Sequence, residues 1–543
     1  MGSLVVVDKL TIRAGDATLV DALSFTIRPG EVLALIGESG SGKTTTALAL
    51  MGHARRGCTI SSGSVRIGDT DVLSLGAGQL RALRGHTVSY IAQSAAASFD
   101  PSRSIMDQVV EPTRIHGTMS RAQAEEKAVQ LFKELALPNP DTIGERYPHQ
   151  VSGGQLQRLM AAMALITDPE LVILDEPTTA LDVTTQIEVL HAFRRVVRER
   201  RATAVYVSHD LAVVAQMADH ILVLRNGQAQ EINTTARILS HPAHEYTQSL
   251  LAAARPTPLA SDLKKGELLL EVNELSAGYG APNAQGKPPV LILEDINFKL
   301  YKGQAIGVIG ESGSGKTTLA RAIAGLIAPC QGNILFKRRP LKAEVRQRSK
   351  EELRQVQIVF QMADTALNPS QTIERILARP LQFYKGLRGP ALQKRINELL
   401  DLVRLPHSVA QRLPGGLSGG QKQRVNLARA LAAEPDLILC DEVTSALDTV
   451  VGAAVLELMA DLRRELGVSY LFISHDLHTV TSVCDEIIVM QHGRKLDLVT
   501  RVNFDRGPHH PYYELLAASV PELRQGWLDE HDAAHHAAMA AAA

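Results

Sequence analysis

The chain has 543 residues, which is too long for one ordinary hydrophobic core and predicts at least two domains. Its formal net charge of -1 argues against a nucleic-acid binder, which would carry a basic surplus. No run reaches the ~18 consecutive apolar residues of a spanning helix, and the first residues lack a signal-peptide pattern. We therefore expect any membrane role to come through partners. Metal-ligand spacing is absent among the four cysteines, which argues against zinc: Cys58, Cys330, Cys440 and Cys484.

The first strong signal is an apolar strand, a glycine-rich loop and a helix at residues 33–52, repeated at residues 306–325. Both copies fit G-x-x-x-x-G-K-[ST], the spacing at which backbone N–H groups surround phosphate oxygens. We call residues 37–44 and 310–317 the phosphate loops. Their lysines are expected to reach the β- and γ-phosphates of ATP, and Thr44 and Thr317 to supply a hydroxyl to Mg²⁺. The predicted ATP-binding residues here are Gly37, Ser39, Gly40, Gly42, Lys43, Thr44, Thr45, Gly310, Ser312, Gly313, Gly315, Lys316, Thr317 and Thr318.

Two glutamines follow β-rich runs at matching places, Gln93 in "YIAQSA" and Gln361 in "IVFQMA". A glutamine can contact Mg²⁺ and water without adding charge, so both are predicted to bind ATP and its metal. Amphipathic stretches at residues 121–137 and 391–405 come next. They predict a mostly helical insertion in each half.

The sequence Ser-Gly-Gly-Gln then occurs twice, each time as a serine cap before a predicted helix. Such a helix N-terminus is a second phosphate-binding device in each half. The economical arrangement is head-to-tail, with ATP between the phosphate loop of one half and this motif of the other. The residues concerned are Ser152, Gly153, Gly154, Gln155, Ser418, Gly419, Gly420 and Gln421.

Two acidic pairs end the next apolar strands, Asp175-Glu176 and Asp441-Glu442. The aspartates are expected to hold Mg²⁺, and the glutamates to act as general bases on the attacking water. His209 and His475 follow later β-rich runs, in "VSHD" and "ISHD". Because the histidine recurs at the same place in both halves, we expect it to contact the γ-phosphate or that water.

These motifs recur in the same order, so the chain is predicted to contain two homologous domains. We expect domains at residues 1–253 and 268–521, joined by a linker rich in Pro, Ser and Lys at residues 254–267. A tail at residues 522–543, which ends in low-complexity sequence, is expected to be disordered. Strands such as "LVILD" alternate with helices, which predicts two tandem P-loop domains of the α/β class.

Over nearly its whole length the chain resembles the nucleotide-binding subunits of ABC transporters. The Walker A, Q-loop, SGGQ signature, Walker B, "ALD" D-loop and "SHD" H-loop motifs stand in order in both halves. The resemblance implies mostly parallel α/β cores with an antiparallel β part, ATP and Mg²⁺ as cofactors, and ATP-driven closure followed by hydrolysis. It also implies a peripheral place on the cytoplasmic face of the plasma membrane.

A finer resemblance is to the ATPases of peptide, nickel and opine importers. It rests on residues 98–109 and 366–377 after the Q-loops, and on "HPAHEYTQSLLAA" and "HHPYYELLAASVP" near the end of each half. It implies two transmembrane permease subunits and an extracytoplasmic solute-binding protein as partners. That subfamily often continues into a cysteine-rich segment; no cysteine follows either copy, so no iron–sulfur cluster is expected.

One departure concerns the aromatic residue that in this family stacks on adenine. Tyr279 fills this place in the second half, whereas the matching stretch of the first half has Ala14. Arg13 is an alternative stacking partner, and Phe25 and Phe298 are interpreted as core residues.

Two other functions compete with a peptide-type importer. A fused sugar-importer ATPase would tend to have one degenerate half, whereas both halves here keep the lysine, aspartate, glutamate and histidine. A soluble tandem ABC protein acting on the ribosome would carry a long charged linker between its domains, whereas the linker expected here, residues 254–267, is short.

Overall fold

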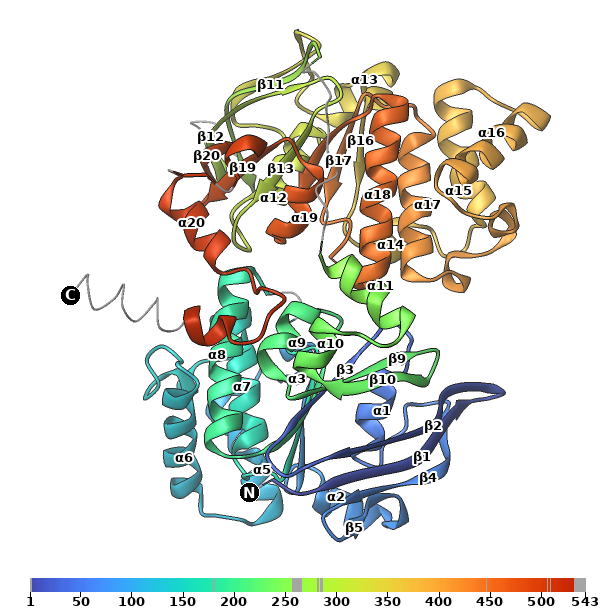
Figure 1. Ribbon diagram of the computed structural model, residues 1–543. Coiled ribbons are helices and arrows are strands. Elements are labelled where there is room, and N and C mark those ends of the chain that lie inside the picture. The colour runs from blue at the N-terminus through green and yellow to red at the C-terminus, as the bar shows by residue number, and fades with distance from the viewer. Residues whose placement is uncertain are drawn as a thin grey trace. The chain divides into compact units, whose positions relative to one another are not determined.

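The computed structural model describes residues 2–178, 181–255, 266–280, 283, 287–445, 447–504, 506–507 and 509–531 (Figure 1). It divides into two compact units. The first comprises residues 1–255, 448–450 and 521–543, and the second comprises residues 256–447 and 451–520. Most of the expected linker, residues 256–265, lies outside the described residues.

The first unit contains a six-stranded sheet in the order β10-β9-β3-β8-β7-β6. Its neighbours are parallel except for the antiparallel pair β9 and β10. The strands are β3 (Val32–Ile36), β6 (Val88–Ile91), β7 (Leu171–Asp175), β8 (Thr203–Val207), β9 (His220–Arg225) and β10 (Gln228–Thr234). A separate antiparallel sheet contains β1 (Val5–Ala14), β2 (Ala17–Ile27), β4 (Cys58–Ile67) and β5 (Thr70–Asp71).

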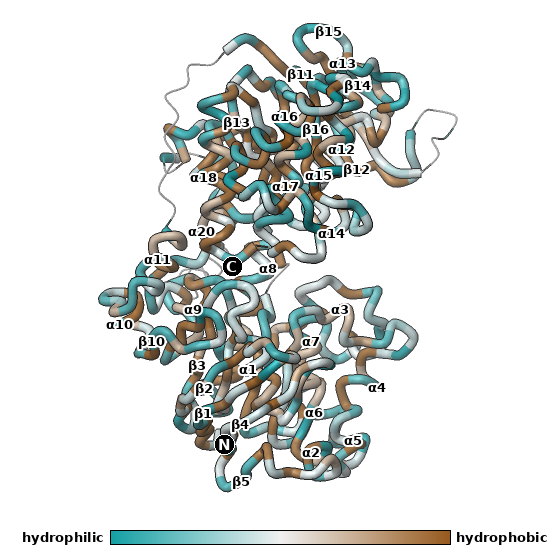
Figure 2. Tube along the Cα trace, turned by 90° about the vertical axis from the view of Figure 1, so that its right-hand side faces the viewer, coloured by the Kyte–Doolittle hydropathy of each residue, from teal (hydrophilic) through white to brown (hydrophobic). Residues whose placement is uncertain are grey.

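Both faces of the larger sheet are buried, which explains its uninterrupted apolar strands. Along β7, Val172 and Leu174 pack into one core cluster, whereas Leu171 and Ile173 pack into another with the antiparallel sheet. The apolar stretches of the strands, brown in Figure 2, lie inside each unit.

The helices of the first unit include the insertion predicted between the phosphate loop and the SGGQ motif. The insertion contains α3 (Ala95–Ser98), α4 (Ile105–Val109), α5 (Glu111–His116) and α6 (Arg121–Glu134). The helix expected over residues 121–137 is therefore present. The other helices are α1 (Lys43–Ala49), α2 (Ala77–Leu83), α7 (Gly153–Leu165), α8 (Val183–Glu199), α9 (Leu211–Met217), α10 (Thr235–Ser240) and α11 (Glu245–Ala254).

The second unit repeats this plan. Its larger sheet has the order β16-β17-β18-β13-β19-β20, again with only the last pair antiparallel. These strands are β13 (Ala305–Ile309), β16 (Val356–Val359), β17 (Leu437–Asp441), β18 (Ser469–Ile473), β19 (Glu486–Gln491) and β20 (Arg494–Thr500). The antiparallel sheet contains β11 (Leu268–Tyr279), β12 (Val290–Tyr301), β14 (Gln331–Phe336) and β15 (Arg339–Pro340).

The helices of this half correspond to those of the first. The stretch expected to be helical at residues 391–405 lies largely in α16 (Gly389–Leu402). The others are α12 (Lys316–Ile323), α13 (Lys350–Gln355), α14 (Ala363–Ala366), α15 (Ile373–Pro380), α17 (Gly419–Leu431), α18 (Thr449–Leu466), α19 (Leu477–Val483) and α20 (Pro511–Ala518). The predicted fold class, two tandem α/β domains with an antiparallel part and a helical insertion, is confirmed.

The C-terminal segment differs from the disordered tail that its composition suggested. Residues 521–531 belong to the first unit, where Trp527 and Leu528 are buried in its core cluster. The Gln216 side chain on α9 donates hydrogen bonds to the carbonyls of Glu522 and Arg524, both at 2.8 Å. The backbone N–H of Leu528 donates to the Gln216 Oε1 atom at 3.1 Å. An apolar anchor and satisfied backbone groups therefore order this segment, while residues 532–543 lie outside the described residues.

Candidate functional site

The two phosphate loops have backbone conformations that only glycine adopts readily. Gly37 and Gly310 follow strands β3 and β13 with φ angles of 146° and 149°. A Cβ atom would lie 2.0 Å from the carbonyl oxygen of Leu224 at the first glycine, and 2.0 Å from that of Met490 at the second. These positions therefore exclude any side chain, and the chain turns sharply from strand to helix.

The lysine of each phosphate loop is buried, and its ammonium group donates hydrogen bonds to backbone carbonyls of the same loop. The Lys43 ammonium donates to the carbonyls of Gly37 at 2.8 Å and Glu38 at 2.9 Å. In the second unit, Lys316 donates to the carbonyls of Gly310 and Glu311, both at 2.7 Å. Burial lowers the pKa of Lys43, against the opposing charge of Glu176. The sequence-predicted lysines thus stand at the centre of their loops.

Each loop threonine meets the strand-terminal aspartate predicted to hold metal. Thr44 donates to the Asp175 Oδ1 atom at 3.0 Å, and Thr317 donates to the Asp441 Oδ1 atom at 2.9 Å. Burial raises the pKa of both carboxyl groups, against the hydrogen bonds that they accept. A hydroxyl and a carboxylate are the oxygen ligands that Mg²⁺ prefers, so the residues present fit this ion.

Tyr90 is a member of the first site that the sequence analysis missed. Its hydroxyl donates to the Asp175 Oδ2 atom at 2.6 Å, so the two carboxylate oxygens of this aspartate have separate donors. Burial and the hydrogen bond to Asp175 raise the pKa of Tyr90. The available signal was its place on strand β6, three residues before Gln93.

In each unit, the predicted general base lies between the predicted glutamine and the predicted histidine. In the first unit, Gln93 donates to the Glu176 Oε2 atom at 3.0 Å, and His209 Nδ1 lies 3.3 Å from Oε1. Burial lowers the pKa of His209, but the hydrogen bond and charge of Glu176 outweigh this effect and the net pKa is raised. The structure thus brings together three residues that are far apart in sequence.

The second unit repeats this cluster. Gln361 donates to the Glu442 Oε2 atom at 2.6 Å, and His475 Nδ1 lies 3.6 Å from Oε1. Burial raises the pKa of Glu442, but the hydrogen bond and charge of His475 outweigh it and the net pKa is lowered. Glu176 and Glu442 both have a φ angle of 50°, a left-handed conformation that is rare for glutamate. Two consecutive carboxylates thus have different partners: the aspartate accepts from the loop threonine, and the glutamate contacts the glutamine and the histidine.

The SGGQ motifs begin helices α7 and α17, as expected. The Ser152 side chain accepts from the backbone N–H of Gln155 at 3.3 Å, and the Gln155 side chain accepts from the backbone N–H of Ser152 at 3.1 Å. Ser418 and Gln421 form the same reciprocal cap. A Cβ atom on Gly154 would lie 2.0 Å from the Thr185 side chain, so the second glycine allows close packing.

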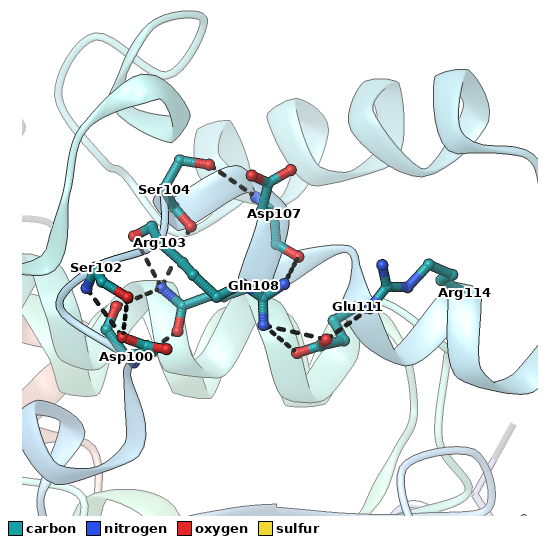
Figure 3. A network of polar contacts seen from close by, with 8 residues as sticks. All are labelled: Asp100, Ser102, Arg103, Ser104, Asp107, Gln108, Glu111 and Arg114. Atoms are coloured by element: carbon teal, nitrogen blue, oxygen red, sulfur yellow. Dashed lines mark hydrogen bonds and ion pairs between the residues drawn. The ribbon is translucent and has the colours of Figure 1, made fainter.

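The segment after Gln93 is folded by a network of polar contacts (Figure 3). Gln108 is buried; its side chain accepts from the backbone N–H of Asp100 at 2.7 Å and donates to the carbonyl of Arg103 at 3.1 Å. Arg103 also pairs with Glu111 at 3.0 Å. These contacts give a fixed shape to residues 98–109, one of the segments that resembles importer ATPases.

The two halves differ at the place where the family resemblance predicts an aromatic residue that stacks on adenine. Tyr279 ends β11 with 42% of its surface exposed, and its hydroxyl lies 3.4 Å from the hydroxyl of Thr318, the residue that follows the phosphate loop. Ala14 ends β1 at the matching place. Phe25 and Phe298 are buried, which confirms that they are core residues.

No helix in the described part of the chain has the length and apolar character needed to cross a membrane. Across the same described ranges, no group of three or more His, Cys, Asp or Glu side chains could hold a metal ion.

The chain belongs to the ABC transporter family. The family model described as "ABC transporter" matches residues 20–179 and 293–445. A second model, "Oligopeptide/dipeptide transporter, C-terminal region", matches residues 498–542. The protein is therefore an ATP-hydrolysing transporter subunit with two ATPase domains in one chain.

Among curated relatives, the glutathione import ATP-binding protein GsiA of Salmonella choleraesuis (strain SC-B67) is 36% identical, over 92% of this chain and 87% of the relative. The protein of that name in Escherichia coli O157:H7 is also 36% identical, over 92% of this chain and 86% of the relative. A solved ATP-binding cassette dimer bound to ADP and Pi is 28% identical, with a TM-score of 0.38, over 44% of this chain and all of that one.

Proposed function

We propose that this protein is the energy-coupling ATPase of an importer for peptides or peptide-like solutes. The observation that carries the proposal is the oligopeptide-type C-terminal region at residues 498–542, in a chain that matches glutathione import ATP-binding proteins over 87% of their length. Glutathione is itself a small peptide. A sugar-importer or ribosome-associated function has no comparable support.

The proposal includes the partners and the location. Two transmembrane permease subunits would carry the solute path, and an extracytoplasmic solute-binding protein would deliver the solute to them. The ATPase would then act as a peripheral subunit on the cytoplasmic face of the plasma membrane. The identity of the solute would be set by the binding protein and the permeases.

The proposed mechanism uses the same residues in each half. Lys43 and Lys316 bind the β- and γ-phosphates, together with the backbone N–H groups of the phosphate loops. Thr44 with Asp175, and Thr317 with Asp441, would hold Mg²⁺, with Gln93 and Gln361 contributing. When bound, this ion neutralises charge on the β- and γ-phosphates.

Glu176 and Glu442 are the proposed general bases. Each accepts a proton from the attacking water at a carboxylate oxygen as the water adds to the γ-phosphorus and the bond to ADP breaks. His209 and His475 orient the glutamate and contact the γ-phosphate. The close approach of histidine and glutamine to both glutamate oxygens supports this assignment.

We also propose that ATP binds head-to-tail, between the phosphate loop of one half and the SGGQ motif of the other. Ser418→Arg is then expected to impair the site containing Lys43, and Ser152→Arg the site containing Lys316, because a bulky cation would obstruct the helix N-terminus facing the γ-phosphate. Photocrosslinking of azido-ATP to each half measures this. If each change affected only the phosphate loop of its own half, the arrangement would be wrong.

Reconstitution in liposomes tests the importer function. The ATPase with its two permeases is mixed with the binding protein, loaded in turn with a dipeptide, glutathione or a monosaccharide. Peptide or glutathione is expected to stimulate ATP hydrolysis and solute uptake, with a Glu176→Gln, Glu442→Gln double variant as the inactive control. Stimulation by the sugar alone would exclude the proposed solute class.

A further inference from the structure

A His-x-Tyr sequence with no role in the proposed mechanism lies near the end of each half, at residues 244–246 and 510–512. In the first half, the His244 Nδ1 atom accepts a hydrogen bond from the backbone N–H of Tyr246 at 3.1 Å. In the second half, the His510 Nδ1 atom accepts from the backbone N–H of Tyr512, also at 3.1 Å. The histidines cap helices α11 and α20, so each tyrosine lies in the first helical turn.

Both tyrosine hydroxyls reach the phosphate loop of their own unit. The backbone N–H of Glu38 donates to the Tyr246 hydroxyl at 3.1 Å, across 208 residues of sequence. The backbone N–H of Glu311 donates to the Tyr512 hydroxyl at 3.0 Å. Both tyrosines are buried. The same contact between the histidine-capped helix and the phosphate loop therefore occurs in both units.

The contact fixes the loop at a defined point. Glu38 follows Gly37, the glycine with a φ angle of 146° at which the chain leaves β3. Its carbonyl accepts from Lys43, while its N–H donates to Tyr246. The peptide groups on both sides of Glu38 are thus held, one by the phosphate-binding lysine and the other by the C-terminal helix. Glu311 is held in the same way by Lys316 and Tyr512.

The surroundings of Tyr246 keep its hydroxyl in place and neutral. The Arg225 guanidinium carbon lies 4.6 Å from the centre of the tyrosine ring, over its face. Burial raises the pKa of Tyr246 to about 12, so the hydroxyl keeps its proton at neutral pH.

We propose that Tyr246 and Tyr512 are positioning residues that hold the phosphate loops in the conformation that binds nucleotide. They would act through the loop without touching ATP. The nucleotide affinity of each site would thereby depend on helix α11 in the first unit and helix α20 in the second. A loop already held in its binding geometry loses less entropy when the phosphates arrive. Removal of one such neutral hydrogen bond is expected to weaken nucleotide binding about two- to tenfold.

The second half offers a matched pair of variants for the test. Tyr512→Phe removes the hydroxyl that contacts the loop. Tyr513→Phe removes the hydroxyl of the next residue, which is also buried and donates to the carbonyl of Phe504 at 3.1 Å, away from the loop. Both changes delete one oxygen atom from adjacent residues of α20. They are compared in full-length protein carrying Lys43→Ala, which leaves the second site to report binding.

Two measurements are made: titration with a fluorescent ATP analogue, and hydrogen exchange of a peptide containing Glu311. Tyr512→Phe is expected to weaken binding and to speed exchange in that peptide, whereas Tyr513→Phe leaves both near the parent. Equal binding by the two variants would overturn the proposal, as would unchanged exchange in Tyr512→Phe.

The first half supplies an independent test if Tyr512→Phe disturbs folding. Tyr246→Phe in a Lys316→Ala background is expected to weaken the first site by the same factor, and full affinity there would overturn the proposal. The inference rests on the proposed phosphate-binding role of the loops. A Lys43→Ala, Lys316→Ala double variant separates the two ideas, because retained binding by that control would refute the loop assignment itself.

Discussion

The Tyr90 hydroxyl lies 2.6 Å from the Asp175 Oδ2 atom and holds the aspartate oxygen that Thr44 does not contact. Tyr90 pairs with Ile173 in the parallel ladder of the first unit. In the second unit, Ile358 pairs with Leu439 at the matching register and has no hydroxyl. The two proposed metal aspartates therefore have different surroundings, although their motifs are alike.

The Tyr90 hydroxyl is therefore predicted to support Mg²⁺-dependent ATP binding at the first site. In a Lys316→Ala background, Tyr90→Phe is expected to raise the Mg²⁺ concentration for half-maximal ATP binding about tenfold, because a hydrogen bond to a charged group is lost. The thermal shift caused by ATP, measured across a Mg²⁺ titration, reports this. Tyr147→Phe, at an exposed tyrosine of the same unit, is the control. Equal Mg²⁺ dependence in both variants would contradict the prediction.

A second prediction concerns the general bases. The Glu176→Gln, Glu442→Gln double variant is expected to bind ATP and to lose a factor of about 10²–10⁴ in turnover, because the water loses its proton acceptor. Binding is measured by titration and turnover by phosphate release. Hydrolysis near the parental rate would remove both glutamates from this role.

A third prediction concerns the pKa of His475. Burial lowers the pKa of His475, and the charge of Lys316 acts in the same direction. The hydrogen bond and charge of Glu442, together with the charge of Asp476, outweigh them, so the net pKa is raised. The native state therefore favours the protonated ring, and this stabilises the fold below the unfolded pKa of about 6.5. The contribution is lost as the pH rises through the folded pKa.

Glu442→Gln removes the hydrogen-bonded charge and leaves burial as the largest effect, so the pKa of His475 is expected to fall. Histidine resonances followed by NMR across a pH titration measure the change, and His475→Gln assigns the resonance. An unchanged pKa would show that Glu442 does not control the protonation of this ring.

The sequence motifs predicted most of the candidate site because their members are close in sequence. The phosphate loop, the Asp-Glu pair and the SGGQ cap each lie within eight residues or fewer, so spacing alone indicates the geometry. The hydrogen bond between Tyr90 and Asp175 could not be predicted this way, because the two residues are 85 positions apart and their strands meet only in the folded sheet. Contacts of this kind depend on register, which local patterns do not encode.

The C-terminal segment shows a different limit. Its alanine- and histidine-rich end suggested disorder from residue 522. Composition averages over a window, and so it hid the short apolar pair Trp527-Leu528, which fills a place in the first unit's core.

A fourth prediction tests this docking. Leu528→Ala is expected to lower the free energy of unfolding by about 2–5 kcal/mol, because it leaves a cavity in the core. Trp527 is the single tryptophan of the chain, so its fluorescence during urea unfolding follows this region. Ile232→Ala, at an exposed residue of the same unit, is expected to stay within about 0.5 kcal/mol of the parent. Equal effects would show that the segment does not stabilise the first unit.

The last prediction concerns the base of the nucleotide. Tyr279 stands beside the second phosphate loop with its hydroxyl 3.4 Å from that of Thr318, whereas Ala14 offers no ring at the matching end of β1. Stacking of a base on an aromatic side chain is worth about 1–3 kcal/mol, or about 5- to 150-fold in affinity. We expect the low end of this range, because Arg13 and nearby apolar residues recover part of the loss.

Variants with one working phosphate loop separate the two sites, Lys316→Ala for the first and Lys43→Ala for the second. The first site is expected to bind ATP more weakly and to discriminate less against GTP, because less of its affinity comes from the base. Ala14→Tyr is expected to strengthen the first site, and Tyr279→Ala to weaken the second towards it. Titration with both nucleotides measures these effects. Equal affinities that respond to neither change would mean that the residue at this position does not stack on adenine.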